Sequence, residues 1–572
     1  MSDEQKPAVE MVDVQIDGEW HQFPKGTRMI EACRQAGRDV PHYCYHPKLS
    51  SPGNCRMCLV EMGMPPRPRP GEELKPDEDG HLPIQWIPRP AIACANTVAP
   101  NMGIRTDSEL TRACRHGVME LLLINHPLDC PICDQAGECR LQEFSVEHGN
   151  GASRFRENKV KKPKNVAIGP RVRLDDERCI MCSRCIRFAD EIADDPVLGF
   201  TDRGSHTTLA VHPGRELANN YSLNTVDICP VGALTSNDFR FQMRVWFLKE
   251  TESICTSCGR GCNLTIGGRE GEVHRLTPRQ NDAVNSAWMC DHGRLNFHYL
   301  NSELRLTDPL IRGEAGHETA TWAQALKTAA AALAGFGPNE VAVIASGRLT
   351  NEELFMARQF AAAVKSEFID IVPRLGEADD YLAAADRNPN TLGAKLILGL
   401  ENPGAGLKSI RDGIAQGRIK ALVALQENLV DDAGFSAGDL GKLEFLLATY
   451  PLANPTAEAA DVVLPGAGFA EKRGSMINLT GRLQRLNRAH AGPGQTREPW
   501  EILRDLIQEL GGGNGIYRAD DVFAAMAAEI KEFAGLKLAD LPADGVALLD
   551  TGETVPLLDR ERERKAKGVI VG

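Results

Sequence analysis

The spacing of apolar and polar residues changes character along the chain. In MVDVQIDGEWHQF (11–23) the two kinds alternate on both sides of Asp17-Gly18, which predicts a β-hairpin with a two-residue turn. TRMIEACRQAG (27–37) has helical spacing and stops at Gly37, a typical helix end. Residues 109–125 predict an amphipathic helix, whereas the proline-rich stretch 63–90 predicts irregular chain.

Beyond residue 305 the apolar residues form continuous short runs. Residues 339–364 predict a strand, a glycine turn and a helix, with Thr350 and Glu353 in capping-box positions. Further runs follow at 367–372, 395–400, 419–425 and 461–465. Such runs alternating with helical stretches predict a parallel α/β sheet.

Composition excludes several classes of protein. A chain of 572 residues has room for several domains, and a net charge of −13 argues against nucleic-acid binding. The first residues, MSDEQKPAVE, lack a secretion signal, and no apolar run approaches the roughly 18 residues of a membrane span. We therefore expect a cytoplasmic protein that meets a membrane through partners. No nucleotide-binding glycine motif occurs, and the basic segment 154–164 is either a solvated connector or a contact for an acidic partner.

Cysteine is the most informative residue type. The chain has 17 cysteines, the last at Cys290. An odd number in a reducing compartment argues against a disulfide framework and favours metal sites.

The first set is Cys44-x10-Cys55-x2-Cys58, with Cys94 the nearest available fourth thiol. A close C-x2-C after a hairpin and a helix resembles [2Fe–2S] ferredoxins, although the spacing departs from the plant-type C-x4-C-x2-C. The proline-rich insertion separates Cys94 from Cys58. His42 and His46 flank the set, but four thiolates already suffice.

The second set is His126-x3-Cys130-x2-Cys133-x5-Cys139. Three thiolates leave one iron of a [4Fe–4S] cluster without a protein ligand. The nearby Cys114 lies within the predicted helix, where a buried structural thiol is the favoured role. His126 precedes a proline, which favours extended chain and could aim its ring at the cluster, so we expect His126 to be the fourth ligand.

The third set follows the bacterial ferredoxin rule of three close cysteines and a distant Cys-Pro. Its members are Cys179, Cys182, Cys185 and Cys229. The positions that a second cluster of such a ferredoxin would use are occupied by Ala189, Asn219, Ser222 and Thr225. One [4Fe–4S] cluster is therefore expected in this segment.

The fourth set is C-x2-C-x3-C with a distant fourth member: Cys255, Cys258, Cys262 and Cys290. Zinc is an alternative occupant, but three thiols within eight residues fit a [4Fe–4S] cluster better. Cys33, on the apolar face of the first helix, and Cys114 are left over. The other fifteen cysteines and His126 supply the ligands of four sites.

Together these motifs resemble the large iron–sulfur subunit of the proton-pumping NADH:quinone oxidoreductase, respiratory complex I (the G subunit in bacteria, the 75-kDa subunit in mitochondria). The order of the four sets carries the resemblance, and ADVVLPGAGFAEKRGSMINLTGRLQ (460–484) resembles molybdopterin oxidoreductases. The resemblance implies one [2Fe–2S] and three [4Fe–4S] clusters, the fourth apart from the main electron path. It implies no molybdopterin, because the C-terminal half is short and offers no cysteine ligand; a serine ligand to molybdenum is a lesser alternative.

The implied fold is α+β and α/β multidomain. Its predicted parts are a β-grasp [2Fe–2S] ferredoxin-like domain (1–107), a histidine-ligated [4Fe–4S] domain with a basic linker (108–165), a ferredoxin-like [4Fe–4S] domain (166–247), an all-cysteine [4Fe–4S] domain (248–304) and a truncated molybdopterin-oxidoreductase-like α/β domain without metal (305–572).

The implied partners are an FMN- and NADH-binding subunit that supplies electrons and a subunit with two [4Fe–4S] clusters that passes them toward quinone, on the cytoplasmic side of the inner membrane. The main alternative is the electron-input subunit of a cytosolic NAD-linked formate dehydrogenase or hydrogenase. A hydrogenase would need further cysteines after Cys290, and there are none. A neutral imidazole in place of a thiolate should raise the potential of the His126 cluster and make it the most acid-sensitive of the four.

Overall fold

The computed structural model describes residues 10–70, 73–513 and 515–571, and these form two compact units. The first unit holds the residues up to Val245 together with those from Glu561 onward, and the second runs from Trp246 to Arg560. The prediction that the chain lacks a secretion signal rests mainly on residues 1–9, which lie outside the described residues. The division of the chain into five domains stays a prediction. Among the described residues no helix is both long and apolar enough to cross a membrane.

The first unit begins with a mixed sheet in the order β2-β1-β6-β3-β4, with β5 paired to β3. Its strands are β1 Met11–Ile16, β2 Glu19–Pro24, β3 Leu59–Met64, β4 Gln85–Trp86, β5 Ala91–Ile92 and β6 Met102–Arg105. The predicted hairpin is confirmed: Ile16 pairs with Glu19, and Asp17 and Gly18 both have positive φ, as this turn requires. Helix α1 (Met29–Gln35) packs on the sheet, and Gly37 follows its end with φ 74°. These elements form a ferredoxin-like β-grasp domain.

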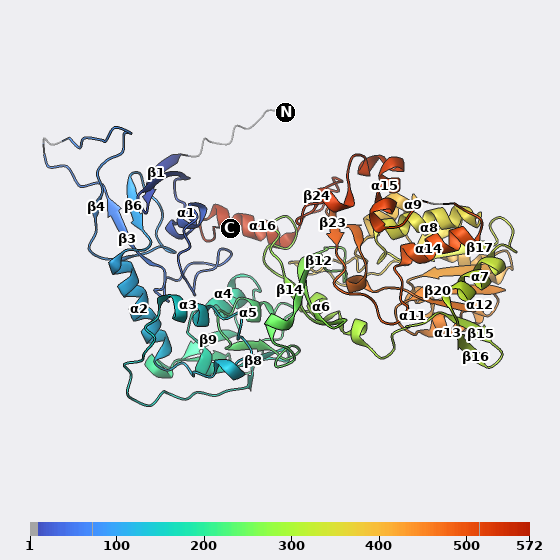
Figure 1. Ribbon diagram of the computed structural model, residues 1–572, viewed down its shortest axis with the longest axis horizontal. Helices are drawn as coiled ribbons and strands as arrows, with labels where there is room; N and C mark the ends of the chain where they lie inside the picture. Colours follow the sequence, from blue (N-terminus) through green and yellow to red (C-terminus); the bar gives the residue numbers. More distant parts are fainter. Residues whose placement is uncertain (1–9, 71–72, 514, 572) are drawn as a thin grey trace. The chain divides into compact units, whose positions relative to one another are not determined.

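The rest of the first unit consists of short elements joined by long loops (Figure 1). Its helices are α2 Glu109–Leu123, α3 Arg140–His148, α4 Arg184–Glu191 and α5 Asn224–Asp227. Its small sheets are β11-β8-β7, from β7 Val166–Ala167, β8 Val172–Leu174 and β11 Leu234–Ser236, and β10-β9, from β9 Leu198–Thr201 and β10 Thr208–Val211. Helix α2 confirms the amphipathic helix. Cys33 is fully buried as predicted, but Cys114 is only half-buried on α2, so its expected burial was wrong.

The basic segment 154–164 binds to its own unit. The Lys159 ammonium donates to the carbonyls of Leu123 and Ile124 at 2.7 and 2.8 Å, closing the C-terminal end of α2. Lys164 pairs with Asp129 and Glu177 at 3.0 Å. These contacts make the segment a docked part of the unit rather than a freely solvated connector.

The C-terminal end of the chain also belongs to the first unit. Helix α16 (Pro556–Ala566) brings Glu561 to 3.4 Å from Lys48, and both side chains are nearly buried. Arg564 pairs with Glu191 of α4, and the Val571 amide donates to the Pro47 carbonyl at 3.2 Å. The last residues thereby pack against the loop that carries the first cysteine set.

The second unit begins with the antiparallel sheet β12-β13-β14, and α6 follows it. These are β12 Lys249–Ile254, β13 Asn263–Arg269, β14 Glu272–Pro278 and α6 Asp291–Leu295. The α/β sheet that follows has the order β16-β15-β21-β20-β19-β17-β18. Its strands are β15 Leu310–Gly313, β16 Gly316–Thr319, β17 Val341–Ala345, β18 Ile369–Ile371, β19 Ala421–Leu425, β20 Phe445–Tyr450 and β21 Val462–Pro465.

Strands β18, β17, β19, β20 and β21 are parallel to one another, which confirms the predicted parallel sheet, and β15 joins its β21 edge in the antiparallel direction. Helices cover both faces (Figure 1). One face carries α7 Trp322–Leu333, α8 Asn351–Ala363, α9 Thr391–Leu398, α14 Pro499–Glu509 and α15 Ala519–Glu529. The other carries α10 Leu407–Ala415, α11 Leu429–Ala433, α12 Ala437–Leu440 and α13 Pro455–Ala459. A small sheet of β22 Gly474–Ile477, β23 Arg482–Leu486 and β24 Val546–Ala547 completes the unit.

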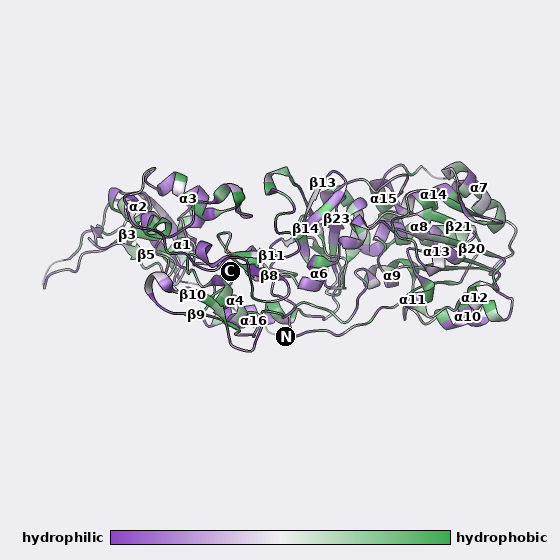
Figure 2. Ribbon diagram, turned by 90° about the horizontal axis from the view of Figure 1, so that it is seen from below, coloured by the Kyte–Doolittle hydropathy of each residue, from purple (hydrophilic) through white to green (hydrophobic). Residues whose placement is uncertain are grey.

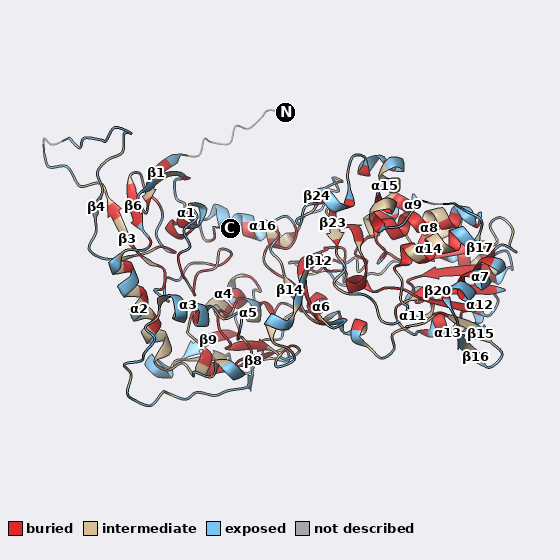
Figure 3. Ribbon diagram, in the orientation of Figure 1, coloured by how far each residue is buried: buried red, intermediate tan, exposed pale blue. Residues whose placement is uncertain are grey.

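Strands β17 and β19 are buried along their whole length, as the buried colour of the central sheet in Figure 3 shows. The capping box at the start of α8 is confirmed, with Thr350 and Glu353 bonded reciprocally. The run 395–400, expected to be a strand, instead lies at the end of α9. A short run of leucine and isoleucine does not distinguish strand from helix, and Gly399, with φ 71°, ends the helix.

Candidate iron–sulfur sites

The first cysteine set comes together at the edge of the β-grasp sheet. Cys58 immediately precedes β3, and the pairing of β3 with β5 extends to a hydrogen bond of 3.1 Å from the Ala93 amide to the Cys58 carbonyl. This pairing places Cys94 beside Cys58, with 3.4 Å between the two sulfurs. A hydrogen bond to Cys44, together with burial, raises the pKa of Cys55 well above its usual value. The four thiols of the first set are therefore neighbours, despite the proline-rich insertion.

The two histidines near this set are engaged locally. The ring Nδ1 of His42 lies 2.8 Å from the Val40 carbonyl, and the ring Nδ1 of His46 accepts the Lys48 amide at 3.2 Å. Burial, with the nearby arginines Arg184 and Arg187, lowers the pKa of His46 to about 3.

The second set surrounds a small cavity. Its walls include all four predicted ligands, His126, Cys130, Cys133 and Cys139. Neither ring nitrogen of His126 has a hydrogen-bond partner among the described residues. Burial lowers the pKa of His126 to about 4, so the imidazole is neutral at neutral pH, which is the form that binds iron.

Backbone geometry at the second set also suits a cluster. Cys139 occupies the N-cap position of α3. Burial raises its pKa to about 11, whereas the amides of Gln142 and Leu141 act in the opposite direction. Amides that point at a sulfur stabilise its thiolate form, which is the form that ligates iron.

The third set surrounds a second cavity, whose walls include Cys179, Cys182, Cys185 and Cys229. Met181 and Ser183, on either side of Cys182, both have positive φ (55° and 60°), a strained conformation for residues other than glycine. Burial raises the pKa of Cys229 to about 11, and the amides that follow Pro230 oppose this rise. Pro230 itself lacks an amide hydrogen, so the hydrogens nearest to this sulfur come from the residues after it.

A single backbone segment separates the second and third cavities. Val231 and Ala233 line the third, whereas Gly232 between them lines the second. A Cβ at residue 232 would lie 2.4 Å from the Cys133 sulfur, so only glycine fits there. The Cys-Pro segment thus contributes a thiol to one cavity and a wall to the other.

The fourth set lies in the second unit. Cys255, Cys258 and Cys262 lie between β12 and β13, and the Cys255 amide donates to the Cys262 carbonyl at 2.8 Å. Cys290 is the N-cap of α6, and its sulfur accepts the Gly293 amide at 3.3 Å. A Cβ at residue 293 would lie 3.0 Å from the Cys255 sulfur and 3.2 Å from the Cys290 sulfur, so both sulfurs face this glycine.

Burial raises the pKa of Cys262, and the nearby Cys255, Cys258 and Cys290 raise it further, as expected for four thiols gathered at one place. Among the described residues no three His, Cys, Asp or Glu side chains converge on a single metal ion. Clusters do not require this, because each iron takes only one protein ligand in a [4Fe–4S] cluster and only two in a [2Fe–2S] cluster.

An apolar cluster connects the first three sites. Its buried members include Cys44 and Cys182 together with Tyr43, Met57, Met119, Phe144 and Val231. Cys55, Cys139, Cys179 and Cys229 pack against it. Arg187 adds a polar connection, because its guanidinium donates to the carbonyls of both Cys44 and Cys182.

Models of known families match the chain in the same order as the cysteine sets. They describe a 2Fe-2S iron–sulfur cluster binding domain (residues 9–80), an NADH-ubiquinone oxidoreductase-G iron–sulfur binding region (115–154), the ferredoxin-like domain of NADH-quinone oxidoreductase subunit 3 (169–235), an NDSU1/NuoG-like 4Fe-4S domain (248–298) and a molybdopterin oxidoreductase domain (305–405 and 388–509).

Relatives match over long stretches of the chain. The G subunit of NADH-quinone oxidoreductase from Rickettsia felis is 31% identical, with 92% of each chain covered. The chain belongs to the G-subunit family of NADH-quinone oxidoreductase. The mitochondrial 78 kDa NADH-ubiquinone oxidoreductase subunit of Neurospora crassa is 32% identical over 89% of this chain and 81% of its own. The corresponding G subunit from Streptomyces coelicolor is 38% identical over 66% of this chain and 43% of its own.

Membership of the G-subunit family confirms the resemblance indicated by the motifs, the mixed α+β and α/β fold, and a role in electron transfer through iron–sulfur clusters. A solved NAD+-reducing [NiFe]-hydrogenase chain is 28% identical over 41% of this chain and 91% of its own, with a TM-score of 0.34, a value too low to bear on function.

Sequence reasoning did not identify the residues around the ligands. Arg187 has no motif of its own, and its role depends on α4 meeting the loop of the first set. Gly232 does carry a signal, since it lies three residues after Cys229 within C-P-V-G-A, but only the structure shows which sulfur it faces.

Proposed function

We propose that this chain relays electrons from an FMN- and NADH-binding subunit toward the quinone-reducing subunits of respiratory complex I. The observation that supports this proposal most strongly is the apolar cluster that joins the first three cysteine sets. Sites that border one apolar, water-poor interior are what electron transfer between neighbouring clusters would require if clusters were held there.

We assign the ligands in four groups. These are Cys44, Cys55, Cys58 and Cys94 for a [2Fe–2S] cluster, and three groups for [4Fe–4S] clusters: His126, Cys130, Cys133 and Cys139; Cys179, Cys182, Cys185 and Cys229; and Cys255, Cys258, Cys262 and Cys290. A bound iron–sulfur cluster accepts and releases one electron at a time. The chain supplies the thiolates and imidazole, directs amides at the sulfurs and excludes water from the sites.

The α/β domain is proposed to carry no molybdopterin, since the sequence after Cys290 has no cysteine to ligate molybdenum. The proposed partners are the FMN- and NADH-binding subunit, the subunit with two [4Fe–4S] clusters and other peripheral-arm subunits. We place the chain on the cytoplasmic side of the inner membrane, held there by these partners, and we retain the five-part domain division.

Metal analysis gives the first test. The four assigned clusters require about 14 iron atoms per chain and an equal amount of acid-labile sulfide. Zinc in place of iron at the fourth set would lower the iron count by about four and would remove that cluster from the proposal.

Replacement of His126 gives the sharper test. His126→Cys adds a negative charge to one cluster, so one low-temperature EPR signal should persist and titrate at a lower potential, while the other signals stay unchanged. His116→Cys, on α2 of the same region but outside the cavity, is the matched control and should change none of the signals. Four unchanged potentials in His126→Cys would remove His126 from the ligands.

A further inference from the structure

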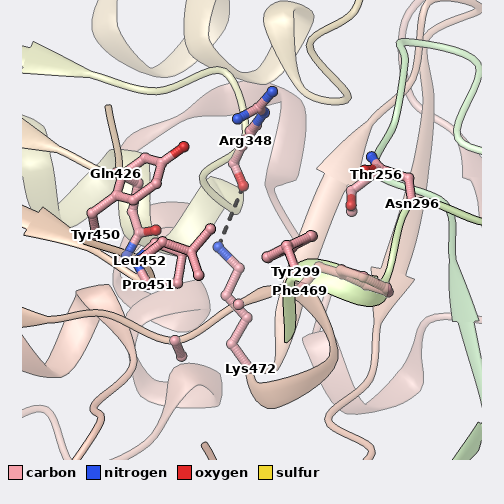
Figure 4. Close-up of a pocket in the computed structure, with 12 residues that line it drawn as sticks. Thr256, Asn296, Tyr299, Arg348, Gln426, Tyr450, Pro451, Leu452, Phe469 and Lys472 are labelled. Atoms are coloured by element: carbon pink, nitrogen blue, oxygen red, sulfur yellow. Dashed lines mark hydrogen bonds between the residues drawn. The ribbon is translucent and has the colours of Figure 1, made fainter. Parts of the chain in front are cut away.

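A cavity of about 250 Å³ lies in the second unit, at the edge of the α/β sheet where parallel strands end (Figure 4). Arg348 follows β17, Gln426 directly follows β19, and Tyr450 is the last residue of β20. The opposite wall carries Thr256, from the loop of the fourth cysteine set, and Asn296, which follows α6.

The strand order makes this edge a natural ligand site. From β17 the chain passes to β18 on one side and then returns to β19 on the other side, so the connections of β17 and β19 diverge. In open α/β sheets the crevice between such strands, at their carboxyl ends, is where ligands bind. Arg348 and Gln426 come from the two strands that flank this crevice.

One cation at the cavity is not held in a direct ion pair. Lys472 also lines the cavity, but its ammonium is bonded to Glu353 at 2.6 Å and to the Arg348 carbonyl at 3.3 Å, the contact drawn in Figure 4. Two nearby carboxylates are paired as well, Glu427 with Arg374 and Glu471 with Arg305. The Arg348 guanidinium forms no hydrogen bond or ion pair with a carboxylate among the described residues; its charge acts on Glu427, but that carboxylate is already paired with Arg374.

Gln426 provides a second, independent observation. The residue is 7% exposed, and its side-chain amide nitrogen finds no hydrogen-bond acceptor among the described residues. Its backbone has φ 57°, a strained value for a residue with a side chain. A Cβ at Gly466 would lie 1.9 Å from that nitrogen, so a glycine is needed to keep the amide where it is. A buried polar group with no partner is rare in folded proteins and points to a ligand that completes it.

The side-chain groups at this cavity that lack hydrogen-bond partners are therefore hydrogen-bond donors. The Tyr450 hydroxyl also lacks a bonding partner among the described residues, and it can donate like the Gln426 amide and the Arg348 guanidinium. Three donors, one of them cationic, suit the oxygens of an oxyanion. The volume lies below the roughly 300–1,000 Å³ of sites for drug-sized ligands, which indicates a small ligand.

We propose that the cavity framed by Arg348, Gln426 and Tyr450 binds a small oxyanion of the phosphate type, either inorganic phosphate or the phosphate group of a small phosphate ester. This site goes beyond the electron-transfer role, and it stands on the geometry of the α/β domain rather than on the cluster assignments. If phosphate did not bind, the cluster assignments would still hold. If the cluster assignments were wrong, the phosphate site would still stand.

Isothermal titration calorimetry of the full chain with inorganic phosphate, at constant ionic strength, tests the proposal. We expect one saturable site per chain, weakened at least tenfold in Arg348→Met and several-fold in Gln426→Leu. Arg418→Met is the matched control, since the Arg418 side chain is exposed on the same domain and hydrogen-bonds only to Gln416 among the described residues; this variant should bind phosphate like the unaltered chain.

Parallel titrations with glycerol phosphate and with malonate distinguish a phosphate ester, free phosphate and a dicarboxylate as the ligand. Tighter binding of glycerol phosphate would indicate a phosphate ester as ligand, and equal or weaker binding would indicate free phosphate. Stronger binding of malonate than of either phosphate would overturn the assignment to phosphate. Two results would overturn the whole proposal. One is the absence of saturable binding up to about 10 mM phosphate, a concentration that would saturate even a weak site. The other is equal phosphate binding by Arg348→Met and Arg418→Met.

Discussion

The cysteine-bearing part of the first unit and the α/β domain of the second unit are stabilised in different ways. Strands β17 and β19 bury every residue, and helices pack on both faces of their sheet. The loops that carry the first three cysteine sets have short elements, and the apolar cluster that they share is built partly from the cysteines themselves. Figure 2 shows the contrast, with apolar strands gathered inside the α/β domain and a mixed pattern around α2, α3 and α4.

The free energy of folding therefore has a different source in each region. In the α/β domain, the burial of apolar side chains from continuous strands and the helices that cover them supplies this free energy. Around α2–α5, bonds from the protein to the clusters would replace much of that core, as metal ligation does in small metal-binding domains. The two regions should therefore respond differently to loss of iron, to lost ion pairs, to pH and to changes of charge.

Removal of iron should have the largest effect, and the cysteine loops and the α/β sheet should respond to it differently. Without clusters, we expect amides in the loops 44–58, 126–139, 179–185 and 255–262 to lose protection from hydrogen exchange by about a hundredfold or more, since their opening free energy falls by several kcal/mol. Amides of β17, β19 and β20 should keep their protection. Hydrogen-exchange mass spectrometry of the chain with and without clusters measures both regions at once, and equal loss of protection throughout would contradict the comparison.

Much of this contrast between the cysteine-bearing loops and the α/β domain could be predicted from the sequence. The residue types and spacings of the cysteine sets indicate iron–sulfur chemistry, because that chemistry needs thiolates at close intervals. The continuous apolar runs indicate the parallel sheet, because a strand covered on both faces needs no polar side. Both signals are local, so a single sequence contains them.

Other features depend on contacts between distant segments. The run 395–400 was expected to be a strand and is helical, while FLLATY (445–450), which the sequence analysis did not single out, forms the central strand β20. Cys94 was the least secure ligand from sequence, and the pairing of β3 with β5 places it beside Cys58. Arg187, Gly232 and the cavity at Arg348 owe their positions to packing that no local pattern records.

Loss of a buried ion pair should destabilise the α/β domain alone. Arg374 binds Glu427, whose side chain is fully buried, and Asp432. Arg374→Met leaves the Glu427 charge buried without a partner, which should lower the free energy of unfolding of this domain by about 3–5 kcal/mol. Urea denaturation followed by circular dichroism gives the stability, and EPR of the clusters in the first unit should remain unchanged.

Lys408→Met is the matched control for this change. Lys408 pairs with Asp412 on α10, where both side chains are exposed, so its loss should cost less than about 1 kcal/mol. Similar losses in the two variants would show that burial of the Arg374 pair does not determine its contribution.

The pH dependence of the α/β domain should depend in part on Glu352. This side chain is fully buried on α8 and accepts two hydrogen bonds of 2.8 Å from Ser475, yet burial raises its pKa from 4.5 to about 7. Because the folded state holds the proton more tightly than the unfolded state, the stability that this proton confers is complete below about pH 4.5. It is lost as the pH rises to about 7, by up to about 3 kcal/mol.

Glu352→Gln should flatten this decline, because glutamine has no proton to lose. Urea denaturation at several pH values between 4.5 and 8 measures the slope for both proteins. Some slope should remain in the variant, since burial also raises the pKa of Glu498 to about 7. Identical slopes before and after the substitution would exclude Glu352 as a contributor.

The smallest expected effect concerns the charge that connects the first and third sites. Arg187 donates to the carbonyls of Cys44 and Cys182, so its cation lies near both ligand sets. A nearby positive charge favours the reduced, more negative form of a cluster. Arg187→Met should therefore lower the midpoint potentials of the clusters assigned to these two sets, by about 40 mV for each kcal/mol of lost interaction.

Redox titration followed by EPR measures these shifts. Arg187→Lys, which retains the charge but not the forked geometry, should shift the potentials less than Arg187→Met. Arg215→Met removes a more exposed arginine that pairs with Asp195 and should leave both potentials unchanged. If Arg187→Met moves neither potential, Arg187 holds the two loops together without acting on the clusters. Its charge would then serve only to stabilise the fold, as the buried Arg374–Glu427 pair does in the α/β domain. The two regions would then differ in their cysteine sets but not in how their buried charges act.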